Sequence, residues 1–172
     1  MGRKIAISGY LGLAVLLGLA LIQSSLGPFL TVVGVHPNLV LVAVIGWTLL
    51  RGPGEGLVWA VIGGLALDLL SGGPFGAATL ALVLTSALAS LGYGRVFGGY
   101  LILPLAHTFP LSLAYYIVYL LLLSVFNRPV AWISSVADII LPASMVNIAA
   151  MFILFPLLRA LHRRTGREEI GW

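Results

Sequence analysis

The sequence contains no cysteine, which excludes disulfide bonds, thiol catalysis and cysteine-bound metals. It is also poor in charge, because only 8% of its 172 residues are Asp, Glu, Lys or Arg, while 60% are hydrophobic. A soluble domain of this length needs more charged side chains to cover its surface. Since a spanning helix takes about 20 apolar residues, the composition predicts a membrane protein with almost no room for a soluble domain.

Motifs of the common enzyme classes are missing as well. The three histidines, His36, His107 and His162, lie far apart in the sequence and lack the spacing of metal ligands. The sequence has no phosphate-binding loop, no dinucleotide fingerprint and no nucleophile elbow. It also lacks the basic stripe interleaved with aromatic residues that is typical of nucleic-acid binding. We therefore expect no enzymatic activity, and no catalytic, metal-binding, cofactor-binding or nucleic-acid-binding residue.

Long apolar runs predict an all-α, polytopic integral membrane protein with about six transmembrane helices. The second and third helices are expected to be short, about 22 and 24 Å against a hydrocarbon core of about 30 Å. The first apolar run is too long for a signal peptide, so we expect it to be retained. Pro104 and Pro110 predict a short lead-in helix before a kinked fifth span, and Pro142 predicts a kink in the last span. The predicted helices cover residues 5–22, 37–51, 55–70, 75–91, 100–126 and 135–158.

The distribution of basic residues predicts the orientation in the membrane. With six spans and a cytoplasmic N-terminus, Arg128 falls outside and every other basic residue falls inside: Arg3, Lys4, Arg51, Arg95, Arg159, Arg163, Arg164 and Arg167. We therefore expect residues 1–172 to form a single transmembrane domain with both termini in the cytoplasm. Residues 159–172 would be a short basic cytoplasmic tail, in which Arg159, Arg163, Arg164 and Arg167 contact anionic lipid head groups.

Asp68 is the costliest residue of the central apolar stretch, since an acid at mid-bilayer costs about 2.5–3.5 kcal/mol. Three roles are open to its carboxylate. It accepts hydrogen bonds from amides of the turn 71–76 or of the next helix, it pairs with Arg128, or it contacts a partner or ligand. Asp138 has a simpler interpretation, because Ser135 and Asp138 fit a capping box at the start of the last helix.

Residues 21–97 carry motifs that resemble the rod shape-determining protein MreD family. The motifs read Pro37-Asn38-Leu39-Val40-Leu41, Arg51-Gly52-Pro53-Gly54-Glu55-Gly56, and a stretch over 63–76 that contains Asp68 and Ser71-Gly72-Gly73-Pro74-Phe75-Gly76. The family typically has an acid where this chain has Asn38. The motifs and the charged residues Arg128 and Asp138 give our candidates for structural or partner-interface roles. These are Pro37, Asn38, Asp68, Pro74, Gly76, Arg128 and Asp138.

The resemblance implies a multi-pass component of the cell-elongation (rod) complex in the bacterial inner (cytoplasmic) membrane, which organises peptidoglycan synthesis and cell shape. It implies direct binding to the bitopic protein MreC. The resemblance also implies binding, either direct or through MreC, to the actin-like MreB, the RodA glycosyltransferase and a class B penicillin-binding protein. Neither a cofactor nor catalysis is implied.

The size and the six-helix layout are also similar to the substrate-binding subunits of energy-coupling-factor vitamin transporters. The alternative function is therefore a small-molecule, vitamin-type substrate-binding subunit of a membrane transporter. Such a site needs polar or aromatic groups that converge from the outer loops. The sequence offers few of them: His36, Asn38, Asp68 and Trp132.

Overall fold

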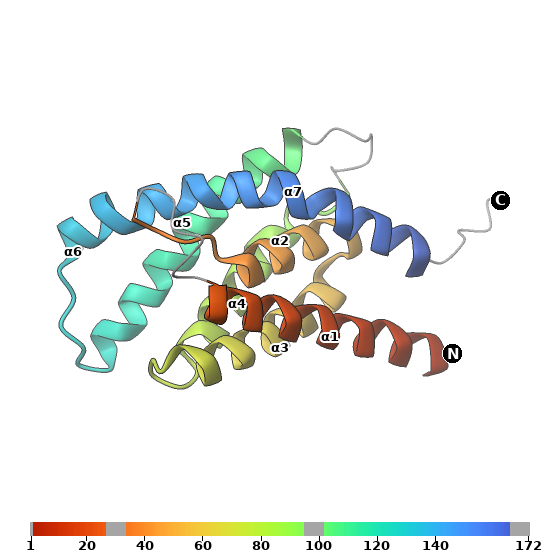
Figure 1. The fold of residues 1–172 in the computed structure, drawn as a ribbon, viewed down its shortest axis with the longest axis horizontal. Helices are drawn as coiled ribbons and strands as arrows, with labels where there is room; N and C mark the ends of the chain where they lie inside the picture. The colour runs from red at the N-terminus through yellow and green to blue at the C-terminus, as the bar shows by residue number, and fades with distance from the viewer. Residues whose placement is uncertain (1, 27–33, 95–101, 166–172) are drawn as a thin grey trace.

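Helices make up every regular element in the computed structural model, which describes residues 2–26, 34–94 and 102–165, with side chains from residue 12 to 25 in the first segment. The prediction of an all-α protein is confirmed for these residues. The elements, coloured along the chain in Figure 1, are α1 (Gly2–Leu26), α2 (Leu39–Arg51), α3 (Pro53–Ser71), α4 (Ala77–Ser90), α5 (Ile102–Val125), α6 (Trp132–Ser134), the π-helical η2 (Ser135–Ile140) and α7 (Leu141–Thr165).

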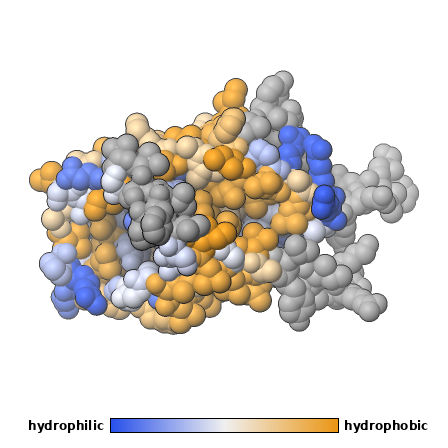
Figure 2. All heavy atoms as spheres, in the orientation of Figure 1, coloured by the Kyte–Doolittle hydropathy of each residue, from blue (hydrophilic) through white to orange (hydrophobic). Residues whose placement is uncertain are grey.

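Three of the described helices are long and apolar enough to cross a membrane: α3, α5 and the continuous helix Trp132–Thr165. The shorter apolar helices are Gly12–Ser25, which is the described part of the first helix, together with α2 and α4. Figure 2 shows hydrophilic residues mainly at the two ends of the long axis and apolar residues over most of the surface between them. This is the surface of a multi-pass membrane protein, and the number of six spans stays a prediction.

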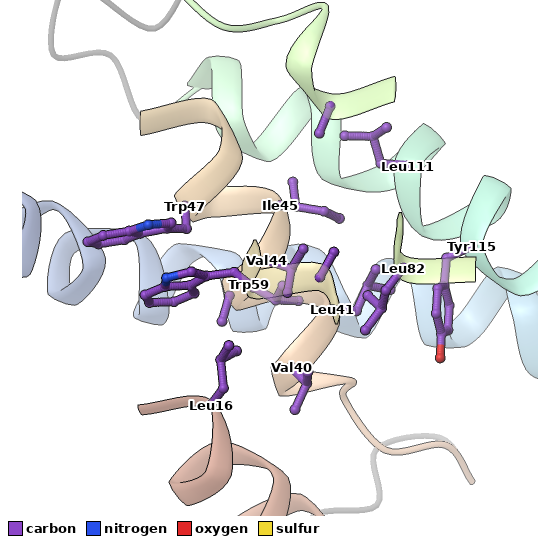
Figure 3. Close-up of a cluster of buried hydrophobic side chains, with 14 of the residues drawn as sticks. Leu16, Val40, Leu41, Val44, Ile45, Trp47, Trp59, Leu82, Leu111 and Tyr115 are labelled. Atoms are coloured by element: carbon purple, nitrogen blue, oxygen red, sulfur yellow. The ribbon is translucent and has the colours of Figure 1, made fainter. Parts of the chain in front are cut away.

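Helix α2 is the centre of the bundle. Each of its residues from Val40 to Leu49 is buried, and it contacts α1, α3, α4, α5 and α7. A helix that is apolar on all sides must be surrounded by other apolar groups, either of the protein or of lipid. For α2 the other helices provide this environment. Figure 3 shows how its side chains meet the neighbouring helices; the Trp47 ring stacks on the Trp59 ring of α3 with their centroids 4.3 Å apart.

Small residues bring the neighbouring helices close to α2 and α3. A Cβ atom on Gly63 of α3 would lie 2.7 Å from Cγ1 of Val40, and one on Gly46 of α2 would lie 2.8 Å from Cδ1 of Leu158. A Cβ atom on Gly64 would collide with the backbone of Thr79 in α4. Since lipid tails are as apolar as leucine, membrane helices associate through this kind of close contact rather than through hydrophobic burial.

The connection between α2 and α3 is a single residue, whereas the predicted helices leave three residues, 52–54, between them. Gly52 has φ 87° and ψ −176°, a conformation open to almost no other residue, and Pro53 begins α3 directly. The third helix therefore has 19 residues, and the prediction that it is short is wrong. The short helices are α2 and α4, with 13 and 14 residues.

The last helix begins earlier than predicted. Ser135 already donates its backbone N–H to the carbonyl of Ala131 at 2.9 Å, so it lies inside a helix that starts at Trp132, and the capping box with the exposed Asp138 is wrong. The wide turn of η2 immediately precedes Pro142, which has no N–H to donate and would crowd a regular turn. From Ile102, where the description resumes, α5 is one helix that has Pro104 in its first turn and runs through Pro110, so no separate lead-in helix lies in this described segment.

The ends of the elements fall into two groups along the long axis. The start of α1 and the end of α7 lie toward one end, while the α3–α4 turn and the α5–α6 connection lie toward the other (Figure 1). The α2–α3 turn belongs with the first group, because Arg51 donates a hydrogen bond to Thr165 near the end of α7.

Candidate functional site

Asp68 binds the start of the following helix with both carboxylate oxygens. Its Oδ1 accepts the N–H of Ala78 at 2.9 Å, and its Oδ2 accepts the N–H groups of Gly76 and Thr79 at 3.0 and 3.2 Å. The Thr79 hydroxyl donates to Oδ2 as well, at 2.6 Å. Asp68 is 5% exposed, and the charge that is costly in an apolar helix is thus buried among four hydrogen-bond donors.

The sequence of the turn explains why a side chain from α3 takes this position. The first amides of a helix lack partners within the helix, and the N-cap residue of α4 is Gly76, with φ 94° and no side chain to accept from them. Asp68 supplies the missing acceptor from the preceding helix. Its negative charge also faces the positive end of the α4 dipole, which offsets its own unfavourable place near the C-terminal end of α3.

The hydrogen bonds of Asp68 are those expected for the first of its three predicted roles. In the described ranges, the ion pair that forms is Arg51–Glu55, at 3.5 Å, and not one between Asp68 and Arg128. Arg128 is exposed, and its backbone N–H donates to the carbonyl of Leu123 at the end of α5. A contact of Asp68 with a partner stays a prediction.

The turn itself is built from residues that permit unusual backbone angles. Gly72 ends α3 with φ 64°, and the N–H of Ala77 donates to the carbonyl of Pro74 at 3.2 Å. On its other side the turn faces α5, since a Cβ atom on Gly73 would lie 2.9 Å from the Tyr119 hydroxyl. The turn is thus held between Asp68 and α5.

A second buried polar cluster joins α2, α5 and α7. The side chain of Asn38 caps α2 by accepting the N–H of Leu41 at 3.0 Å, so α2 begins at Leu39 and not at the predicted Pro37. The backbone N–H of Asn38 donates to Oδ1 of Asn147 at 2.8 Å, and Nδ2 of Asn147 donates to the Ser112 hydroxyl at 3.2 Å. Asp and Asn are equally good N-caps, so the amide of Asn38 can cap α2 as well as the acid that the resemblance leads us to expect there.

A cavity of about 490 Å³ lies between these two polar clusters. Its wall includes Asn38, the end of α3 at Ser71, the start of α4 at Ala78, and a row of tyrosines on α5. The rings of Tyr115 and Tyr119 are parallel with centroids 6.1 Å apart, and Tyr116 meets Tyr115 edge-on at 5.2 Å. The site combines aromatic faces with hydroxyl and amide groups.

At the other end of the bundle, Arg51 joins α2, α3 and α7. Its guanidinium pairs with Glu55, donates to the hydroxyl of Thr165, and lies 5.2 Å from the centroid of the Trp47 ring. The indole N–H of Trp47 donates to Glu55 at 3.2 Å. The Arg51–Glu55 pair therefore belongs to a structural junction across the one-residue turn.

The basic residues predicted to touch lipid lie on the last turns of α7. Arg163 and Arg164 are exposed and Arg159 is half-buried, beside a second hollow of about 410 Å³. Arg167 and Arg95 lie outside the described residues, as do residues 27–33 of the connection between the first two predicted helices. Within the described residues, no group of three or more His, Asp or Glu side chains could hold a metal ion.

Sequence reasoning did not identify Asn147, Ser112 or the tyrosine row as parts of one site. Asn147 carried a usable signal, because an amide in the middle of an apolar helix is expensive unless it is paired. The partners of Asn147 could not be predicted from the sequence, since Asn38 and Asn147 are 109 positions apart.

Comparison with known proteins gives one match. The family model described as rod shape-determining protein MreD matches residues 4–165 of the 172-residue chain. No curated protein and no solved structure matches the chain. The similarity to energy-coupling-factor transporter subunits therefore stays a prediction.

Proposed function

We propose that this chain, which belongs to the rod shape-determining protein MreD family, is a membrane scaffold of the bacterial cell-elongation complex that binds MreC. Through MreC or directly, it would position MreB, RodA and a class B penicillin-binding protein for peptidoglycan synthesis. The observation that carries this proposal is the family match, which covers residues 4–165 and thus nearly all described helices. Scaffolding also agrees with the resemblance of residues 21–97 noted from the sequence.

The packing of the bundle supports a scaffold. The charged and polar residues singled out in its interior, Asp68 and Asn147 among them, bind other elements of the same chain. On its outside, α4 presents a row of half-exposed leucines, Leu80, Leu84 and Leu88, at helical spacing. A rigid interior with apolar outer faces suits a protein that holds partner helices in fixed positions within lipid.

The proposed orientation is multi-pass in the inner membrane, with both termini cytoplasmic. It is supported by the basic residues of α7 and by the position of the start of α1 and the end of α7 toward one end of the molecule (Figure 1). An even number of crossings puts both ends on one side. Arg159, Arg163 and Arg164 would then contact anionic head groups of the inner leaflet.

The cavity favours one second candidate, the small-molecule-binding subunit of a transporter, since its volume falls within the range of ligand pockets, about 300–1,000 Å³. Affinity purification from native membranes separates the two functions. If the protein is a scaffold, the purification should recover MreC in a fixed ratio, together with other rod-complex proteins. Recovery of an ATPase module in place of MreC would overturn the scaffold in favour of the transporter subunit.

A further inference from the structure

The cavity beside the tyrosine row is lined by several polar residues, which a packing gap between apolar helices does not require. The polar residues of its described wall are Gln23, His36, Asn38, Ser71, Tyr115, Tyr116, Tyr119 and Ser135. These groups alternate with apolar side chains such as Leu67, Ile140 and Ala143. Genuinely empty cavities in proteins are apolar, so a wall of this kind suits an occupant that forms hydrogen bonds, whether water or a ligand.

The wall also restricts what the occupant can be. The described lining contributes no Asp, Glu, Lys or Arg side chain. An ionic ligand would therefore lose its hydration without gaining a counter-charge. The nearby carboxylate of Asp68 is already held by four donors from the start of α4. A wholly apolar ligand, in turn, would make no use of the hydrogen-bonding groups of the wall.

The arrangement of the tyrosine rings further restricts the chemical class of the ligand. Tyr115 and Tyr119 present parallel rings one helical turn apart, and Tyr116 stands edge-on beside them. Ring faces of this kind pack against flat apolar surfaces, while the surrounding amides and hydroxyls both donate and accept hydrogen bonds. A ligand that fits has an apolar face and several hydroxyl groups, which is the surface of a sugar ring.

We propose that this cavity binds an uncharged, hydroxyl-rich glycosyl group, supplied either by a neutral glycolipid head group or by a free sugar. The bound group bridges the Asp68 turn, through Ser71 and Ala78, to α5 and α7, through Tyr119 and Ala143. This goes beyond the scaffold function and does not depend on MreC. A ligand here stabilises the end of the bundle that carries the α3–α4 turn.

The test uses the full-length chain purified in a sugar-free detergent, because glucoside and maltoside detergents carry the proposed chemical group. The protein is reconstituted in phosphatidylcholine nanodiscs, and its melting temperature is followed by tryptophan fluorescence. The four probes are monoglucosyldiacylglycerol, diacylglycerol without a sugar, anionic phosphatidylglycerol, and free methyl glucoside. We expect the glucosyl lipid, the free glucoside or both to raise the melting temperature, and diacylglycerol to leave it unchanged. Any shift with phosphatidylglycerol reports its contact with the basic residues of α7 and should be the same in a variant whose cavity is filled.

Two pairs of variants locate the binding. Tyr116→Phe removes one hydroxyl from the wall and should weaken the affinity about tenfold, while Tyr93→Phe, which lies against Gly52 outside the cavity, should bind as wild type. Ala143→Leu fills the cavity and should abolish the shift, while Ala137→Leu on the exposed face of the same helix should keep it.

The result also identifies the source of the ligand. A shift with free methyl glucoside identifies a soluble sugar, and a shift with the lipid alone identifies a membrane glycolipid; both support the proposal. It is overturned if neither sugar probe stabilises the protein, if diacylglycerol stabilises it equally, or if Tyr116→Phe and Ala143→Leu bind as their controls do.

Discussion

Thr79 binds the carboxylate of Asp68 twice, donating its backbone N–H at 3.2 Å and its hydroxyl at 2.6 Å to the same oxygen, Oδ2. The two residues come from different helices, and the close approach of those helices depends on Gly64, which faces Thr79. Both the charge of Asp68 and the small size of Gly64 therefore serve one junction between α3 and α4.

Substitutions of Asp68 should destabilise the isolated protein in a graded order. Asp68→Asn can keep its oxygen in the place of Oδ2, which retains three of the four hydrogen bonds and turns the amide toward Ala78. Asp68→Ala or Asp68→Leu leaves all of these donors unpaired and should cost about 1–3 kcal/mol or more. Thermal unfolding of the purified chain without a partner measures the order.

The threonine offers the matched control for this junction. Thr79→Val removes only the hydroxyl that binds Asp68 and should destabilise the protein by about 0.5–1.5 kcal/mol. Thr85→Val changes a buried hydroxyl in the same helix that bonds only within that helix, to the carbonyl of Ala81, and should cost less. An unaltered melting temperature in Asp68→Leu would refute a stabilising role for the junction.

Asn147 and Ser144 lie one turn apart in α7 and should respond oppositely to alanine. Asn147→Ala strands the N–H of Asn38 and the hydroxyl of Ser112, and should cost about 1–3 kcal/mol. Ser144 is fully buried, and its hydroxyl has no hydrogen-bond partner in the described part of the chain. Ser144→Ala should therefore be neutral or stabilising in the same unfolding assay; equal losses in both variants would argue against the cluster.

The glycines of α3 should separate packing from helix propensity. Gly64→Ala places a methyl group against the backbone of Thr79 and should destabilise by about 1–3 kcal/mol. Gly54 lies in the same helix with open space around it, so Gly54→Ala should stabilise by about 0.5–1 kcal/mol. Unfolding of the two purified variants provides the comparison, and a stable Gly64→Ala protein would contradict the close α3–α4 contact.

The absence of cysteine makes the proposed orientation directly measurable. Single cysteines at the exposed positions Ser25, Phe75 and Arg128 should react with a membrane-impermeant maleimide at the outer side. Cysteines at Gly54 and Arg164 should react only after the inner side is made accessible. One position labelled from the opposite side would change the number of spans and disprove the six-span topology.

Local features of the fold could be predicted from the sequence, and the contacts between distant helices could not. The role of Asp68 was accessible because its acceptor function concerns a turn only eight to eleven positions away. The helix boundaries were harder to predict. Gly52 alone makes the turn for which residues 52–54 were expected, because Pro53 is well suited to the first helical position.

The cavity and the Asn38–Asn147 bond depend on how α2 is enclosed. Apolar periodicity identifies each helix, but the faces of uniformly apolar helices are nearly indistinguishable in sequence. The sequence alone does not distinguish tyrosines that line a cavity from tyrosines that pack between helices, and only the position of α5 beside the α3–α4 turn makes those of α5 the wall of a cavity.

Direct titration of purified MreC against this protein in nanodiscs tests the central proposal. A fluorophore on a single cysteine at Gly54, an exposed position, reports binding without altering the buried polar clusters. The scaffold account predicts saturable binding at a fixed ratio, and predicts that Asp68→Leu loses binding only to the extent that it loses folded protein. Absence of saturable MreC binding by the folded wild-type chain would contradict the account.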